Sequence, residues 1–95
     1  MPRAVHQVLA TLGYGDAIGH EVLGIQRVLR DAGYQSDIFV QTAEPRVEHL
    51  TLHYSELQDA SHPDNILIHH FSIGSRAPRL AHALPDRMVL IYHNL

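Results

Sequence analysis

Three glycines surround one acidic residue in the stretch "LGYGDAIGHE", which follows a short apolar run and precedes a helical pattern. Gly13, Gly15 and Gly19 are spaced G-x-G-x-x-x-G, so the third glycine falls one residue later than in the dinucleotide-binding fingerprint. Glycines let a backbone approach an anion, and the N-terminus of the following helix offers unpaired N–H groups with a partial positive charge. The spacing predicts a loop that can face a phosphate, while Asp16 can also be the N-cap of a plain strand-to-helix turn.

A standard nicotinamide site would need a further acidic residue at the end of the second predicted strand, about 20 residues after the glycines. Asp37 lies at the start of that strand instead, and Gln41 stands at its end. The sequence therefore argues against a nicotinamide cofactor, and we expect no cofactor.

Polar side chains also follow the later apolar runs of the chain. His69, His70 and Ser72 end one run, and His93 with Asn94 ends the last. Ligands of an open parallel sheet bind outside the carboxyl ends of its strands, so we expect these groups and the glycine loop to converge on one edge. His93 ends the most apolar run, where a polar group needs either a hydrogen-bond partner or a function. Both readings of His93 stay open.

The chain contains nine histidines, which raises the question of a metal site. His49 and His53 have the i, i+4 spacing of two ligands on one helix face, but the segment around them is poorly helical. Neighbouring residues of a strand point to opposite faces, so His69 and His70 cannot bind one ion. With no cysteine and no H-E-x-x-H motif, we expect no metal site, and no role is assigned to His49, His53 or His62.

Hydrophobic periodicity indicates the elements that position these residues. The pattern predicts strands at 4–10, 36–40, 65–71 and 87–93, helices at 17–32 and 75–84, and a surface connection at 42–65 with a short extended piece at 50–52 and a helical turn at 55–60. The helix at 17–32 has the clearest signal, because Ile18, Val22 and Ile25 recur at helical spacing and Gly33 follows its end. Gly24 costs about 1 kcal/mol relative to alanine in a helix, and we interpret it as a point of close helix–sheet packing.

The order strand, helix, strand, strand, helix, strand predicts an α/β fold with a Rossmann-like, open and mostly parallel sheet flanked by helices. The last two strands are almost continuously apolar, a pattern typical of parallel strands covered on both faces. Residues 1–95 form at most one domain, and the sequence stops directly after a predicted core strand. We therefore expect a truncated domain whose exposed sheet edge can self-associate.

The charge pattern narrows the class of partner. The formal net charge is −3, with seven arginines, no lysine and no block of like charge. This pattern argues against a surface that binds nucleic acid or an anionic membrane. No run approaches the roughly 18 apolar residues of a membrane span, and the start of the sequence has no hydrophobic signal core. We expect a small-molecule partner and, by default, a cytoplasmic location.

Three stretches, "GYGDAIGHEVLGIQRVLRDAGYQSDIFV", "NILIHHFSIGS" and "VLIYHNL", together resemble the amino-terminal domain of the family 4 (group 1) glycosyltransferases of the GT-B fold. The resemblance covers nearly all of the chain, and residues 42–62 are its least informative part. Members of that family are two-domain retaining enzymes that transfer a sugar from a nucleotide-sugar donor. The acceptor, a sugar or glycan, is held largely by the amino-terminal domain, and the transfer requires no metal.

The resemblance implies roles for particular residues. Gly13, Gly15 and Asp16 match the glycine-rich loop that faces the interdomain cleft near the donor phosphates and the acceptor. His93 matches the histidine that touches the transferred sugar, and it is the expected catalytic residue. The residues expected to line the acceptor side are His70, Ser72, Gly74 and Asn94.

The sequence departs from the family pattern in two places. Relatives often have Asn-Asp after the last glycine of the loop, where this chain has His20 and Glu21. The carboxyl-terminal domain, which binds the nucleotide and carries paired glutamates in an E-x7-E motif, is not in the sequence. We therefore expect the isolated chain to be inactive in sugar transfer. The alternative is a small non-catalytic α/β binding or self-association module.

Overall fold

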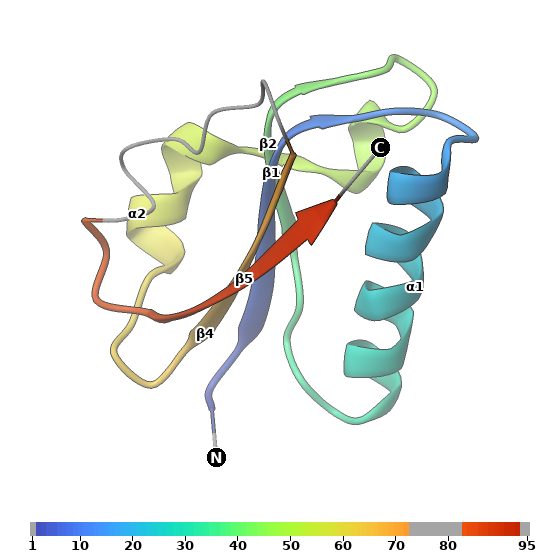
Figure 1. The fold of residues 1–95 in the computed structure, drawn as a ribbon. Helices are drawn as coiled ribbons and strands as arrows, with labels where there is room; N and C mark the ends of the chain where they lie inside the picture. Colours follow the sequence, from blue (N-terminus) through green and yellow to red (C-terminus); the bar gives the residue numbers. More distant parts are fainter. Residues whose placement is uncertain (1, 73–82, 94–95) are drawn as a thin grey trace.

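A five-stranded sheet is the centre of the computed structural model, which describes residues 2–72 and 83–93 (Figure 1). Its elements in chain order are β1 (Val5–Leu12), α1 (Ala17–Asp31), β2 (Ile38–Ala43), a 3-10 turn (Glu48–Leu50), β3 (Leu52–His53), a second 3-10 turn (Tyr54–Glu56), α2 (Leu57–Ala60), β4 (Ile66–Ser72) and β5 (Arg87–His93). The strand order is β3-β2-β1-β4-β5, and every pair is parallel. The predicted α/β fold with a Rossmann-like open sheet is confirmed.

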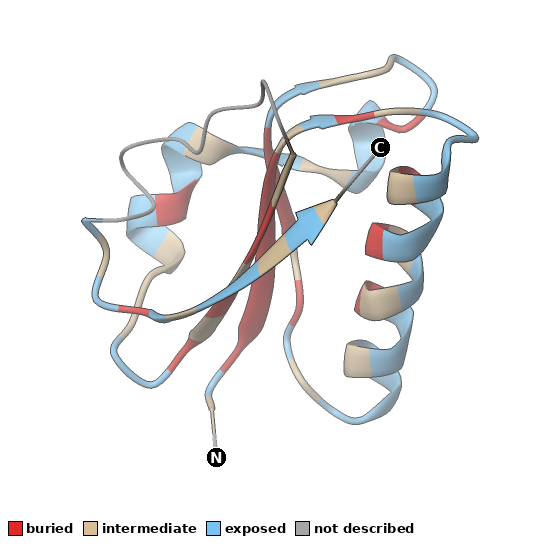
Figure 2. Ribbon diagram, viewed as in Figure 1, coloured by how far each residue is buried: buried red, intermediate tan, exposed pale blue. Residues whose placement is uncertain are grey.

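Side chains that alternate along β1 divide the core into two layers. On one face, Leu9 packs with Val22 of α1. On the other face, Val8 packs with Leu57 of α2 and Leu67 of β4. Figure 2 shows the buried segments concentrated on the central strands and on the side of α1 that faces them. The central strands are therefore covered on both faces, as the apolar run at 65–71 predicted for β4.

The long helix α1 forms where the sequence predicts it. Asp16 precedes its first turn as the N-cap, and Val22 of its inner face is fully buried. Gly33 adopts a φ of 96° just after the helix, a conformation that favours glycine at helix ends. Neither α1 nor another helix within the described ranges is long and apolar enough to cross a membrane.

The strand boundaries differ from the prediction at the second strand. The strand expected at 36–40 lies at Ile38–Ala43, because β1 and β2 stay paired as far as Leu12 and Ala43. Ser36 precedes the strand, and its carbonyl accepts hydrogen bonds from Gln26 at 3.0 Å and Arg30 at 2.9 Å. These contacts come from α1 and are not readable from local periodicity.

Other expected segments agree more closely with the structure. The strand at 87–93 is confirmed, and the strand at 65–71 is shifted by one residue. The extended piece expected at 50–52 overlaps β3 only at Leu52, because Leu50 ends the first 3-10 turn. The helical turn at 55–60 corresponds to the second 3-10 turn and α2. Residues 75–82 of the helix expected at 75–84 lie outside the described residues.

The position of β5 corrects the expectation of a covered core strand. Along the described chain β5 pairs with β4 alone and is the last strand of the sheet. Three of its apolar side chains are substantially exposed, namely Val89 at 44%, Leu90 at 56% and Tyr92 at 47%. An apolar run indicates a tendency to be buried, but it does not state what covers the strand.

The interpretation of Gly24 as a close-packing position is wrong. This residue is exposed, and a Cβ added there would meet nothing within 4 Å. Gly24→Ala is therefore expected to raise the free energy of unfolding by about 1 kcal/mol, because alanine loses less backbone entropy in a helix. Urea denaturation measures this change, and an unaltered or lowered stability would contradict it.

Candidate functional site

The turn between β1 and α1 is closed tightly around Asp16. Gly15 has a φ of 73°, in the left-handed region that favours glycine. A Cβ on Gly13 would overlap the carboxylate of Asp16. A Cβ on Gly19 would lie 2.8 Å from the Gly13 carbonyl oxygen and 2.9 Å from Asp16 Oδ1. Each of the three glycines is thus required by the geometry of the turn itself.

Asp16 is the N-cap of α1. Its backbone is extended, and its Oδ1 accepts a hydrogen bond from the Gly19 N–H at 2.6 Å. The carboxylate therefore takes one of the free amides at the helix N-terminus and adds a negative charge there. An anion at this turn would have to bind the other amides, so the predicted phosphate role remains a prediction beside the capping role that is observed.

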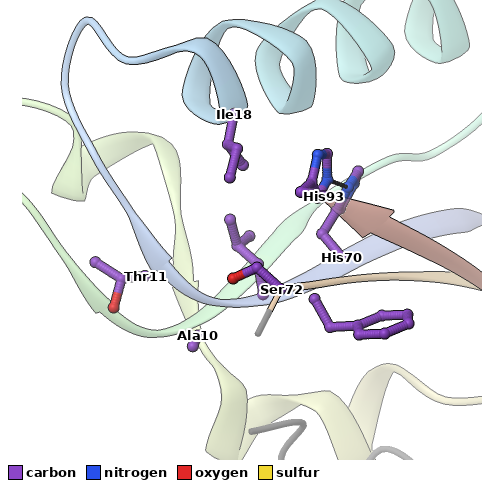
Figure 3. A pocket seen from close by; sticks show the side chains of 8 residues that line it. Ala10, Thr11, Ile18, His70, Ser72 and His93 are labelled. Atoms are coloured by element: carbon purple, nitrogen blue, oxygen red, sulfur yellow. Dashed lines mark hydrogen bonds between the residues drawn. The ribbon is translucent and has the colours of Figure 1, made fainter. Parts of the chain in front are cut away.

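A pocket of about 180 Å³ lies at the carboxyl ends of the strands. It is lined by side chains from β1, the first turn of α1 and the ends of β4 and β5, namely Leu9, Ala10, Thr11, Ile18, His70, Phe71, Ser72 and His93 (Figure 3). The structure thus brings together three of the residues singled out in the sequence, His70, Ser72 and His93.

The remaining expected site residues are placed differently. Gly13, Gly15 and Asp16 form the turn next to the pocket but do not line it. Gly74 and Asn94 lie outside the described residues.

Two histidines of the pocket are in direct contact. His70 Nδ1 lies 2.9 Å from His93 Nε2, and the two rings stack with centroids 5.1 Å apart. The other nitrogen of His70, Nε2, lies 2.7 Å from Oε1 of Gln7 in β1. Gln7 Nε2 in turn donates to the Val22 carbonyl of α1 at 2.9 Å. A continuous hydrogen-bonded chain therefore connects the backbone of α1 to His93.

The register of the sheet explains why these side chains meet. Gln7 pairs with Ile68, and His70 is two residues further along β4. In the same way His70 pairs with Ile91, and His93 is two residues further along β5. Residues offset by two across a strand pair share one face and are within reach of long side chains. The diagonal contacts therefore place the hydrogen-bonded side chains of Gln7, His70 and His93 on the α1 side of the sheet.

His70 is 3% exposed, and its surroundings disfavour a charge. Burial, together with the neighbouring His93 and His69, lowers the pKa of His70 to about 4. His70 is therefore a neutral imidazole at neutral pH. On the pocket's outer side, His93 Nδ1 lies 3.6 Å from Oε2 of the half-exposed Glu21.

Three other histidines have contacts within their own segments of the chain. The His69 ring packs at a tilt of 34° against Phe71 of the same strand, with ring centroids 5.6 Å apart. His53 Nδ1 lies 2.8 Å from the Ser55 hydroxyl, and His62 Nδ1 accepts the Asp64 N–H at 3.0 Å. Over residues 2–72 and 83–93, no group of three or more His, Cys, Asp or Glu side chains could hold a metal ion.

Sequence reasoning missed Gln7 and Glu21 as members of the site. Gln7 did leave a signal, because it stands in the middle of a buried strand, where a polar side chain needs a partner. Glu21 left none, since a half-exposed glutamate in a helix is ordinary.

Comparison with known proteins adds no relative. No protein-family model, no curated protein and no solved structure matches the chain. The geometry of the pocket and the resemblance in the sequence are therefore the basis for a functional assignment.

Proposed function

We propose that the chain is the acceptor-side, amino-terminal part of a retaining glycosyltransferase of the GT-B fold. Such an enzyme moves a sugar from a nucleotide-sugar donor to a sugar or glycan acceptor. The observation that carries the proposal is the convergence of β1, the first turn of α1 and the ends of β4 and β5 on one pocket. Ligands of open parallel sheets bind at this edge, and the three resembling stretches contribute to the same edge.

The lining of the pocket suits a sugar. Leu9, Ile18 and Phe71 supply apolar surface, and Thr11 and His93 supply hydrogen-bonding groups. A sugar ring needs both, because its hydroxyls hydrogen-bond and its C–H faces pack on apolar side chains. The volume of about 180 Å³ is below the roughly 300–1,000 Å³ of pockets for drug-sized ligands. It accommodates one ring-sized part of a larger ligand, with His93 placed to hold a hydroxyl.

The β1–α1 turn is the proposed contact for the donor phosphates. Its free amides would help to neutralise the leaving diphosphate. A cation stands close by, since the Arg46 guanidinium lies 3.8 Å from the centroid of the Tyr14 ring. Arg46 also pairs with Glu44 at 3.0 Å, which balances part of its charge. In this proposal Asp16 keeps its capping role and fixes the amides in position.

The test is an NMR titration of the isotope-labelled chain with UDP or GDP and, separately, with glucose or mannose. The nucleotides are expected to shift backbone amides of residues 13–19, and the sugars the signals of His93. His93→Ala should retain a folded spectrum and lose the sugar-induced shifts, whereas the matched control His53→Ala should keep them. The absence of shifts at millimolar ligand would overturn the proposal.

A second candidate function, self-association without catalysis, is favoured by the exposed apolar side chains of β5. An edge strand presents unpaired N–H and C=O groups that can template a second copy of the chain. Leu90 and Tyr92, about half exposed, would be covered in such a dimer. A stable dimer in sedimentation, with no ligand shifts in the titration above, would favour this function over the transferase.

A further inference from the structure

We infer that Gln7 sets the proton positions of the His70–His93 pair, so that Nδ1 is the ring nitrogen of His93 left to accept a proton or a hydrogen bond. Gln7 is then a positioning residue, which acts on the pocket through His70. The inference concerns the same pocket as the proposed function. Its part about a ligand rests on that function, whereas the proton positions do not.

The Val22 carbonyl determines the orientation of the Gln7 side-chain amide. The side-chain group within 2.9 Å of the Val22 carbonyl must be a donor, because a carbonyl oxygen can only accept. The Nε2 group of Gln7 therefore faces Val22, and Oε1 faces His70. Gln7 is fully buried, so no bulk water can replace either contact. A backbone carbonyl of α1 thus determines which end of the amide meets the histidine.

Gln7 in turn determines which ring nitrogen of His70 carries the proton. Oε1 of Gln7 can only accept, so His70 Nε2, 2.7 Å away, must carry a hydrogen. A neutral imidazole has one ring proton, which leaves a lone pair on Nδ1 of His70. His70 is neutral at neutral pH because burial holds its pKa at about 4. His70 therefore acts as a donor toward Gln7 and as an acceptor toward His93.

His70 determines which ring nitrogen of His93 carries the proton. Its Nε2 lies 2.9 Å from the lone pair of His70 Nδ1 and must donate. Neutral His93 is therefore the Nε2–H tautomer, and its lone pair is on Nδ1. That atom lies 3.6 Å from Oε2 of Glu21. A proton taken up by His93 goes to Nδ1, next to a carboxylate, and a sugar hydroxyl in the pocket would donate its hydrogen bond to the same atom.

The two histidines could also carry their protons on the opposite ring nitrogens, but Gln7 disfavours that arrangement. With the proton of His70 on Nδ1, His93 would accept at Nε2 and donate from Nδ1 to Glu21. That arrangement sets the Nε2 lone pair of His70 against Oε1 of Gln7, and rotating the amide would set Oε1 against the Val22 carbonyl. Removing the acceptor at position 7 should therefore reverse both tautomers, because His93 can then donate a hydrogen bond from Nδ1 to Glu21.

The experiment is a long-range ¹H–¹⁵N NMR spectrum of the histidine rings at pH 8, without ligand. In the unmodified chain His70 and His93 are both expected as Nε2–H tautomers, and an Nδ1–H tautomer at either residue would overturn the inference. In Gln7→Leu both residues should change to Nδ1–H. Gln7→Glu should retain the native pattern, because a carboxyl group offers His70 an acceptor in either protonation state.

A control variant and the spectrum of the unmodified chain complete the test. Glu21→Gln lies on the exposed side of the pair and should leave the His70 tautomer unchanged. If Gln7→Leu does not fold, the tautomers of the unmodified chain still decide the inference. If both histidines of the unmodified chain are Nε2–H tautomers and the sugar titration fails, the proposed function alone is refuted. If they are Nδ1–H tautomers and the titration succeeds, the inference alone is refuted.

Discussion

Gly19→Ala is expected to lower the free energy of unfolding by about 2 kcal/mol. The added Cβ would lie 2.8 Å from the Gly13 carbonyl oxygen and 2.9 Å from Asp16 Oδ1, so both the turn and the N-cap must move. Overpacking of this kind costs about 1–3 kcal/mol and a lost N-cap about 1 kcal/mol. The higher helix propensity of alanine returns about 1 kcal/mol. Urea denaturation of the purified variant measures the net change.

Gly24→Ala is the matched control for this prediction, because it makes the same chemical change in the same helix. A Cβ at Gly24 meets nothing within 4 Å, so only the gain in helix propensity remains. The two variants are therefore expected to change stability in opposite directions. Equal effects would show that the β1–α1 turn is not closed around Asp16 as described.

Acidification from pH 7 to pH 5 is expected to cost the fold about 2 kcal/mol through His70 alone. Burial lowers the pKa of His70 from 6.5 to about 4, so the unfolded chain binds a proton in this range and the folded chain does not. The contribution of neutral His70 to the free energy of unfolding is complete above pH 6.5. It is lost as the pH falls toward 4, at about 1.4 kcal/mol per pH unit. His6 contributes in the same direction, since burial lowers its pKa too.

Urea denaturation at several pH values between 7 and 5 checks this dependence. His70→Gln should flatten it by the share of His70, whereas His53→Gln, at an exposed position, should preserve it. In the unmodified chain the NMR signals of the His70 ring should titrate near pH 4. A midpoint near 6.5 would contradict the buried, neutral state of His70 irrespective of how the variants behave.

The sequence alone determined the elements whose signals are local. The helix α1 follows from apolar residues at helical spacing, an N-cap at Asp16 and a glycine just after its end. The range 87–93 was predicted as a strand from its apolar run and observed as β5. Convergence of strand ends on one edge also follows, because the carboxyl ends of parallel strands must point the same way. The pocket with His70, Ser72 and His93 was predictable in this sense.

The tertiary structure alone decided which residues meet. Gln7 and His70 are 63 positions apart, and only the register of β1 with β4 makes them diagonal neighbours. The same holds for Gly19. A side chain cannot be accommodated there because the carbonyl of Gly13 lies directly across the turn. Strand order placed β5 at the edge of the described sheet, although its apolar run is typical of a covered strand. Periodicity records the preference of each residue for burial or helix, whereas a contact depends on the residues that other elements bring to it.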